Sequence, residues 1–128
     1  MARPAAKDLT ERELELMHVY WRHGEQTAAK ARDRLAADGP DLTYPTVANL
    51  VRGLHEKGFL EPTNGERPFR YRPQRSYEDV SGRLLGDVVR RVFGGSREQL
   101  LVRLVGQGRL TARERSLLEE VLKEQGDE

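Results

Sequence analysis

Side chains that could contact another molecule recur along one side of a predicted helix in the middle of the chain. Residues 41–60 carry apolar residues at helical spacing, with a proline suited to the first turn and Gly58 at the end. The open side of this helix presents Thr46, Asn49, Arg52 and Gly53, and its start carries Thr43 and Tyr44. An asparagine amide can pair with adenine in the DNA major groove, and threonine or arginine can contact bases or phosphates. Each of these residues also fits an ordinary exposed position.

Four arginines and no acidic residue lie in residues 67–75. Arg67 comes first, and the alternation that follows predicts a strand with two aromatic side chains inward and Arg70 and Arg72 outward. Arginines can neutralise DNA phosphates, which positions a protein on the duplex without reading its sequence. Solvated surface charge is the alternative. The lack of acids in the segment favours phosphate contacts.

Side chains suited to catalysis or metal binding form no recognisable pattern. His18, His23 and His55 lack metal-ligand spacing with one another or with carboxylates, and the chain has no cysteine. No nucleophile–base arrangement or glycine-rich phosphate loop stands out. The sequence therefore predicts no catalytic residue, no metal site and no cofactor, and we do not expect an enzyme.

Length and composition limit the classes of protein to consider. The 128 residues can hold one domain or two small units, and 34% of them are charged against 37% hydrophobic. Because the net charge is only +1, a nucleic-acid partner requires locally concentrated positive charge. The start lacks the apolar stretch of a secretion signal, and no apolar run approaches the ~20 residues that span a bilayer. We expect a soluble, cytoplasmic protein with no membrane partner.

Three helices and a hairpin must position the side chains described above. A capping box at Thr10 predicts a helix over residues 11–23, and a short alanine-rich helix over residues 28–37 follows. After the third helix, strands at 59–62 and 69–72 flank a turn signal, Asn64-Gly65. This is the layout of a winged helix, whose third helix enters the major groove. We predict a mainly α protein with a small β-hairpin, in which residues 1–75 form a winged helix-turn-helix DNA-binding domain.

The apolar pattern changes after Ser76. Glycines separate three further predicted helices, whose apolar faces carry too little bulk to close a core alone. Residues 76–128 are therefore predicted to form a helical dimerisation region of a homodimer. The residues expected at the dimer interface are Val80, Leu84, Val88, Val92, Leu100, Leu104, Leu118 and Leu122.

Five motifs extend over nearly the whole chain. They are LTERELELM at 9–17 with Trp21, YPTV at 44–47, LHEKG at 54–58, YRP at 71–73 and VFGGSREQLLVRLVGQGRLT at 92–111. In this order they resemble the penicillinase-repressor (BlaI/MecI) family of winged-helix transcriptional regulators. The resemblance implies a homodimeric repressor that binds an inverted repeat in double-stranded promoter DNA. It also implies that the third helix and the wing contact DNA and that the C-terminal helices intertwine as the dimer interface.

The chain departs from this family at several points. Gly53 stands where an arginine is usual and Asn49 where a threonine is common, so we expect a different operator sequence. The best-known members are inactivated by proteolysis at an Asn-Phe bond, and the aligned bond here is Arg103–Leu104. A regulatory protease is therefore a candidate partner, and the inducing signal stays open. The cysteines of the copper-responsive relatives are absent.

Two other functions fit parts of the sequence. A winged-helix module that binds protein instead of DNA would agree with the near-neutral charge and with Gly53. A repressor that responds to a small molecule would share the DNA chemistry but needs a ligand pocket. The short helices predicted after Gly95 offer little material to line one.

Overall fold

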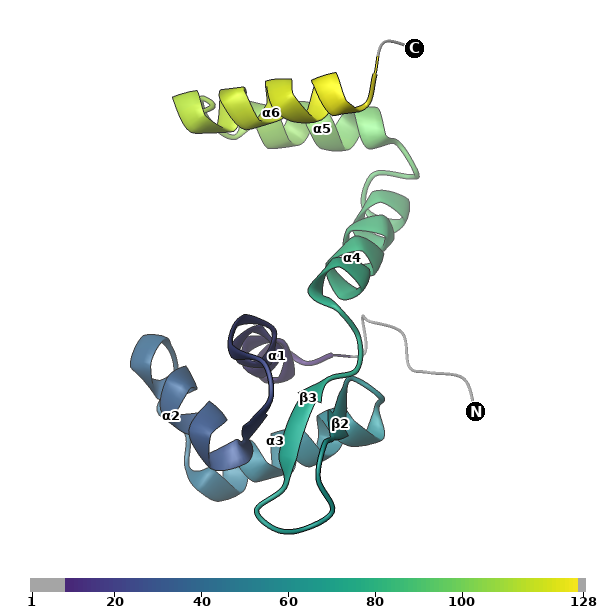
Figure 1. Ribbon diagram of the computed structural model, residues 1–128. Coiled ribbons are helices and arrows are strands. Elements are labelled where there is room, and N and C mark those ends of the chain that lie inside the picture. The colour runs from purple at the N-terminus through teal and green to yellow at the C-terminus, as the bar shows by residue number, and fades with distance from the viewer. Residues whose placement is uncertain (1–8, 127–128) are drawn as a thin grey trace. The chain divides into compact units, whose positions relative to one another are not determined.

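The computed structural model describes residues 9–126, within which six helices and three short strands occur (Figure 1). Their order is α1 (Glu11–His23), β1 (Gln26–Thr27), α2 (Ala28–Asp38), α3 (Tyr44–Glu56), β2 (Leu60–Pro62), β3 (Arg70–Pro73), α4 (Tyr77–Arg91), α5 (Arg97–Gly106) and α6 (Ala112–Glu124). This mainly helical architecture with a small antiparallel sheet confirms the predicted fold class. None of the helices in the described residues is both long and apolar enough to cross a lipid bilayer.

Hydroxyl side chains fix where the helices begin. The side chain of Thr10 accepts a hydrogen bond from the backbone N–H of Glu13, and the side chain of Glu13 accepts one from the backbone N–H of Thr10. Thr111 and Glu114 form the same reciprocal pair at α6. A cap of this kind contributes about 1 kcal/mol to helix stability, and its pattern is visible in the sequence.

The chain divides into two compact units, with the boundary between residues 86 and 87. The first unit holds α1, α2, α3, the sheet and the first part of α4. Its core combines residues from all of these helices with Phe59 and the first residue of β2. The buried apolar residues are Leu16, Met17, Val19, Tyr20, Ala31, Leu35, Val47, Val51, Leu54, Phe59, Leu60 and Val80.

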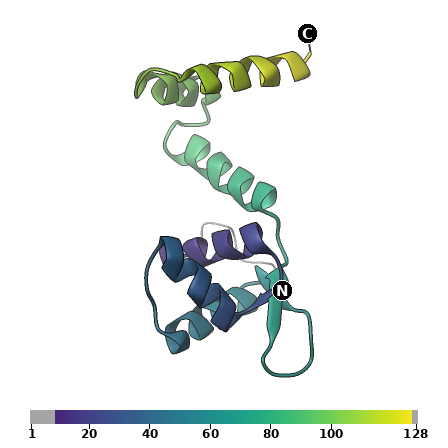
Figure 2. The ribbon, with the colours of Figure 1, turned by 60° about the vertical axis from the view of Figure 1, so that its left-hand side comes forward.

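The sheet has one strand more than the sequence predicted. β3 lies between β1 and β2 and pairs antiparallel with both, so that Gln26 faces Tyr71 and Glu61 faces Arg72. β1 has only two residues, too few to show an alternating pattern in the sequence. We call β2, β3 and residues 63–69 between them the wing, whose loop extends away from the helices in both views (Figures 1 and 2).

The hairpin predicted around Asn64-Gly65 is confirmed, and residues 63–69 form the loop between its two strands. The side chain of Asn64 accepts a hydrogen bond from the backbone N–H of Arg70 at 2.8 Å. Its amide group donates to the carbonyl oxygens of Glu66 and Pro68. Asn64 therefore closes a wide loop through its side chain, whereas a tight turn would place it in the left-handed backbone region.

The second unit begins within α4 and continues through α5 and α6. Gly94 and Gly95, with φ of 58° and 85°, end the segment after α4 in a conformation that residues with a Cβ rarely adopt. No residue of α5 or α6 is buried in the single chain. Their exposed large apolar side chains are Leu101, Val102, Leu104, Val105, Leu117, Leu118, Val121 and Leu122.

Candidate nucleic-acid interface

The start of α3 gathers the polar residues that the sequence predicted to contact DNA. Thr43 is the N-cap, and its hydroxyl oxygen lies 2.9 Å from that of Thr46. Tyr44, Asn49 and Arg52 are exposed along the same helix, as are both threonines. The two threonine hydroxyls already bond to each other, so Asn49 and Arg52 have more hydrogen-bonding capacity left for a partner.

Gly53 does not lie on this open side, and its predicted position is wrong. A Cβ at Gly53 would be 3.2 Å from Oε2 of Glu13 in α1. Glu13 is only 5% exposed, and its other carboxylate oxygen lies 2.8 Å from Nζ of Lys57. Gly53 therefore permits a close approach of α1 to α3, and a larger side chain there would meet Glu13 before it met solvent. A helical projection alone does not reveal this crossing.

The wing arginines divide into two groups. Arg72 donates two hydrogen bonds to Oε1 of Glu61, at 2.9 and 3.1 Å, and Arg70 lies 3.8 Å from Glu25. Both side chains are exposed, so these ion pairs contribute little stability, but each guanidinium has a carboxylate beside it. The prediction that the segment lacks acidic partners is therefore wrong. It considered only neighbours in the sequence.

Arg67 differs from these two residues. Within residues 9–126 it forms no ion pair, and its guanidinium carbon lies 5.6 Å from the ring centroid of Phe69. Arg52 in α3 also has no carboxylate partner among the described residues. Arg67 and Arg52 are thus the guanidiniums of this surface that are most available to an anionic partner.

The fourth arginine of the segment belongs to the core. Arg75 is 5% exposed, and its guanidinium carbon lies 4.6 Å from the centroid of the Phe59 ring. Its Nε donates to Asp79 at 3.1 Å, and its carbonyl oxygen accepts a hydrogen bond from the indole of Trp21. Hydrogen bonds from Arg83 and Arg75 hold the pKa of Asp79 below its ordinary value. Arg75 joins the end of the sheet to α1 and α4.

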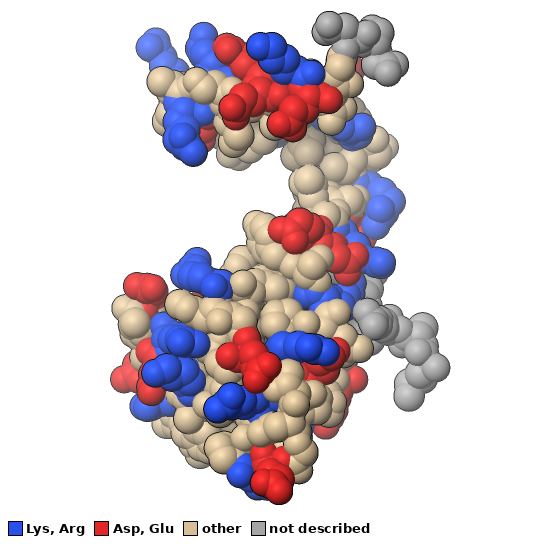
Figure 3. Space-filling view, viewed as in Figure 1, with Lys and Arg blue, Asp and Glu red and all other residues tan. Residues whose placement is uncertain are grey.

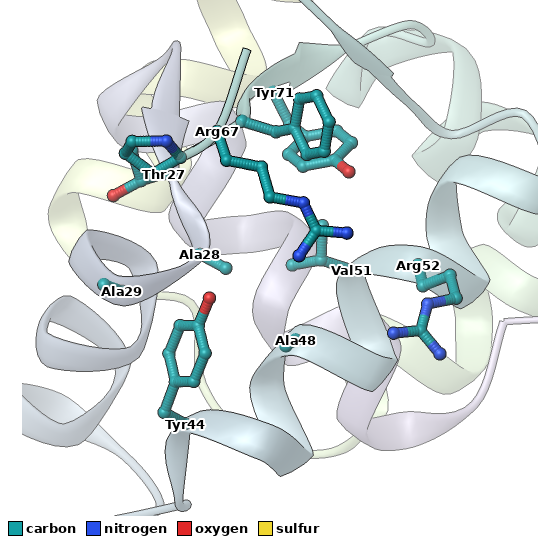
Figure 4. Close-up of a pocket in the computed structure, with 11 residues that line it drawn as sticks. Thr27, Ala28, Ala29, Tyr44, Ala48, Val51, Arg52, Arg67 and Tyr71 are labelled. Carbon is teal, nitrogen blue, oxygen red and sulfur yellow. The ribbon is translucent and has the colours of Figure 1, made fainter.

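A hollow of about 460 Å³ lies between the start of α2, α3 and the wing (Figure 4). Ala28, Ala48 and Val51 are among the apolar residues that line it. Arg67 extends into it from the wing, and the hydroxyl group of Tyr44 points into it from α3 (Figure 4). No acidic residue lines it. The hollow combines an apolar lining with positive charge.

Charge over the rest of the first unit is mixed. Figure 3 shows lysines and arginines interspersed with aspartates and glutamates on the face that it presents, without a large area of one sign. Among the described residues, no group of three or more histidines, aspartates and glutamates could hold a metal ion. An anionic partner would therefore be attracted by a few local cations instead of a broad basic field.

The residues predicted for dimerisation fall into two sets. Val80 is fully buried in the core of the first unit, and Leu84 packs against that core. Val88, Val92, Leu104, Leu118 and Leu122 are exposed, and Leu100 is half-buried. Arg103 and Leu104, the predicted cleavage bond, lie inside α5. Sequence spacing could not distinguish an apolar side chain that is buried in the core of its own unit from one that stays exposed.

Comparison with known proteins agrees with this description. The family described as Penicillinase repressor matches residues 9–124. A solved structure described as the DNA-binding domain of the repressor BlaI is 23% identical to this chain, covering 61% of this chain and 93% of that one with a TM-score of 0.52. At this identity the likeness shows the fold.

A second solved structure, the reduced form of MarR from E. coli, is 15% identical, covering 94% of this chain and 80% of that one with a TM-score of 0.47. No curated protein matches the chain significantly. The family match extends over most of the sequence and over both units. On this ground, the chain is a member of the penicillinase repressor family.

Proposed function

We propose that this chain is a homodimeric transcriptional repressor that binds an inverted repeat in promoter DNA through α3 and the wing. The observation that carries the proposal is the open side of α3, where Asn49 and Arg52 are exposed and Arg52 lines the same hollow as Arg67 of the wing. Asn49 is suited to adenine in the major groove, and the two arginines are suited to phosphates or guanine. Thr43, Tyr44 and Thr46 complete the contact surface at the start of the helix, and Arg70 and Arg72 flank it on the wing.

Homodimerisation is supported by the second unit. In the single chain α5 and α6 bury none of their residues, although both carry several large apolar side chains. Open apolar surface of this extent is typical of an interface with another chain. A two-fold dimer would present two copies of α3 to half-sites about one helical turn of DNA apart. Val80 is not part of this proposed interface, since it is already buried.

Selection of randomised duplex DNA on the purified protein at ~150 mM salt tests the proposal, because purely electrostatic binding is weakened there. We expect enrichment of an inverted repeat. The Asn49→Ala variant serves as the matched protein, and it should keep the repeat but lose the preference at one base position of each half-site. If both proteins showed the same base preference at every position, Asn49 would not contact a base.

The competing function is a winged-helix module that binds protein. The mixed charge of the first unit and the ion pairs of Arg70 and Arg72 agree with it. Gly53 no longer favours it, since its contact with Glu13 explains the glycine by packing. Absence of enrichment even at low salt would reject the repressor and leave the protein-binding module as the remaining function.

Release from DNA by proteolysis is a further part of the proposal. Arg103 and Leu104 are exposed but helical, so α5 must open locally before a protease can take this bond as an extended segment. Incubation with lysates of induced cells, followed by mass spectrometry of the fragments, would locate the cut. A cut elsewhere, or none, would remove this bond from the release mechanism.

A further inference from the structure

The hollow between α3 and the wing lies next to the side chains that are proposed to contact DNA. It is lined by apolar residues at its base, including Ala48 and Val51. Two guanidiniums, Arg67 and Arg52, and the hydroxyl group of Tyr44 provide hydrogen-bond donors around this base (Figure 4). A partner that fits must combine a negatively charged group with an apolar body.

The position of the hollow determines which part of a duplex would reach it. When a helix lies in the major groove, a sugar–phosphate strand runs along each side of that groove. The wing stands next to α3, with the hollow between them (Figure 4). A strand at the edge of the groove that holds α3 must therefore pass between α3 and the wing.

We propose that this hollow is a binding site for one sugar–phosphate unit of each operator half-site. Arg67 donates to the phosphodiester oxygens from the wing, and the hydroxyl group of Tyr44 donates to them from the start of α3. The apolar base lies beneath the deoxyribose. This inference rests on the proposed function and specifies a contact within it.

Charge pairing explains why Arg67 has this role while its neighbours do not. Arg70 and Arg72 each have a carboxylate within 4 Å, Glu25 and Glu61 respectively, so a phosphate must compete with an existing ion pair. Arg67 has no ion pair among the described residues, and its guanidinium reaches the hollow (Figure 4). The wing therefore contacts the backbone mainly through Arg67, and the two outward arginines of β3 contribute less.

A neutral-linkage scan tests this site. The inverted-repeat duplex obtained by selection is prepared as a series in which single phosphates of a half-site are replaced by uncharged methylphosphonates. Wild type and the Arg67→Gln, Tyr44→Phe and Arg72→Gln variants are titrated against each duplex. Because Arg67, Tyr44 and Arg72 are exposed, all variants should unfold at the wild-type temperature.

At one linkage, the neutral duplex should bind wild type about ten-fold more weakly, the size of a charge-assisted hydrogen bond. On the unmodified duplex, Arg67→Gln should bind about ten-fold more weakly than wild type. Neutralising that linkage should then weaken the binding of the variant almost no further. For Tyr44→Phe, neutralising the same linkage should weaken binding by less than it does for wild type. Arg72→Gln, the matched control, should keep the full wild-type response there.

The salt dependence gives a second readout. Arg67→Gln should lower the slope of log affinity against log salt by about one phosphate contact, and Arg72→Gln by less. If every neutral linkage weakens Arg67→Gln as much as wild type, the hollow is not a phosphate site, even though the selected repeat still supports the repressor. If no repeat is selected, the repressor and the phosphate site are both rejected.

Discussion

Lys57 at the C-terminal end of α3 places its Nζ atom 2.8 Å from Oε1 of Glu13 in the first turn of α1. The same oxygen accepts a hydrogen bond from the backbone N–H of Thr10 at 2.9 Å. The carboxylate thus closes the start of α1 and connects it to the helix proposed to enter DNA. Since Glu13 is 5% exposed and Lys57 is half-buried, both interactions are partly shielded from water, which makes them stronger than on the open surface.

Replacing Glu13 by glutamine should lower the free energy of unfolding by about 2 kcal/mol, because Lys57, which is half-buried, loses its carboxylate partner. Urea unfolding measures this. Glu15→Gln is the matched control on the same helix, since Glu15 pairs with Arg12 at the surface. It should cost less than about 0.5 kcal/mol. Similar losses for both variants would show that burial gives the Glu13 pair no advantage.

The stability that Glu13 provides should depend on pH. Burial raises the pKa of Glu13, but hydrogen bonds from Lys57 and Thr10 and the charge of Lys57 outweigh it, so the pKa lies below the ordinary value of 4.5. A carboxyl group whose pKa is depressed on folding stabilises the protein above its unfolded pKa, and this stabilisation is lost as pH falls through the folded pKa.

The difference in unfolding free energy between wild type and Glu13→Gln should therefore be constant from pH 7 to about 5 and shrink below pH 4.5. Urea unfolding of the two proteins across this range measures it. Subtracting the variant removes the contribution of other carboxyl groups such as Asp79. A difference that stayed constant down to pH 3 would contradict the lowered pKa.

Gly53→Ala tests the close approach of α3 to Glu13. Alanine is favoured over glycine within a helix by about 1 kcal/mol, but here its Cβ would be 3.2 Å from Oε2 of Glu13. We expect no net gain in stability in the wild-type protein. In a Glu13→Ala background the same change should stabilise by the full ~1 kcal/mol, because the obstructing oxygen is absent. Equal effects in both backgrounds would mean that the contact is free of strain.

Leu122→Glu should disrupt the proposed dimer without unfolding the chain, since this α6 side chain is 60% exposed in the single chain. Sedimentation velocity should show a monomer at concentrations where wild type is a dimer. Ser116→Glu introduces the same charge on the polar side of α6 and should leave the dimer intact. Dimers of equal strength for both variants would exclude this face of α6 from the interface.

Local signals explain why the helices could be predicted. The capping box at Thr10 and the glycine at position 24 define α1 within a few residues of sequence, and the predicted helix over residues 11–23 is confirmed. Pro45 was expected in the first turn of the third helix, and α3 begins at Tyr44. Caps act over three or four residues, so no tertiary information is needed to find them.

The pairing of the wing could not be predicted in this way. The strands predicted at 59–62 and 69–72 form the hairpin, but the turn signal at Asn64-Gly65 does not give its register, in which Glu61 lies opposite Arg72. Without the register, the carboxylate beside Arg72 could not be identified from the sequence. The side chain of Asn64 closes this loop by bonding to the backbone at 66, 68 and 70. An asparagine can form such bonds but does not always do so, so its presence does not fix the register.

Two contacts of the candidate site were also beyond the sequence. Gly53 follows the exposed residues of α3 at helical spacing, and only the packing of α1 shows what lies beside it. Glu25 approaches Arg70 because β1 pairs with β3. A strand of two residues is too short for this pairing to be predicted from the sequence. Both depend on segments distant in the chain, whereas propensity and periodicity are local.

The burial of Val80 limits how this protein can be dissected. A fragment ended after the wing, at Arg75, would keep every side chain proposed to contact DNA but would leave a cavity where Val80 fills the core. α4 extends from Tyr77 to Arg91, so the boundary between the units falls inside a helix. A chimera with a foreign assembly module would therefore have to keep the first part of α4, through Gly86, to retain the side chain that fills this core.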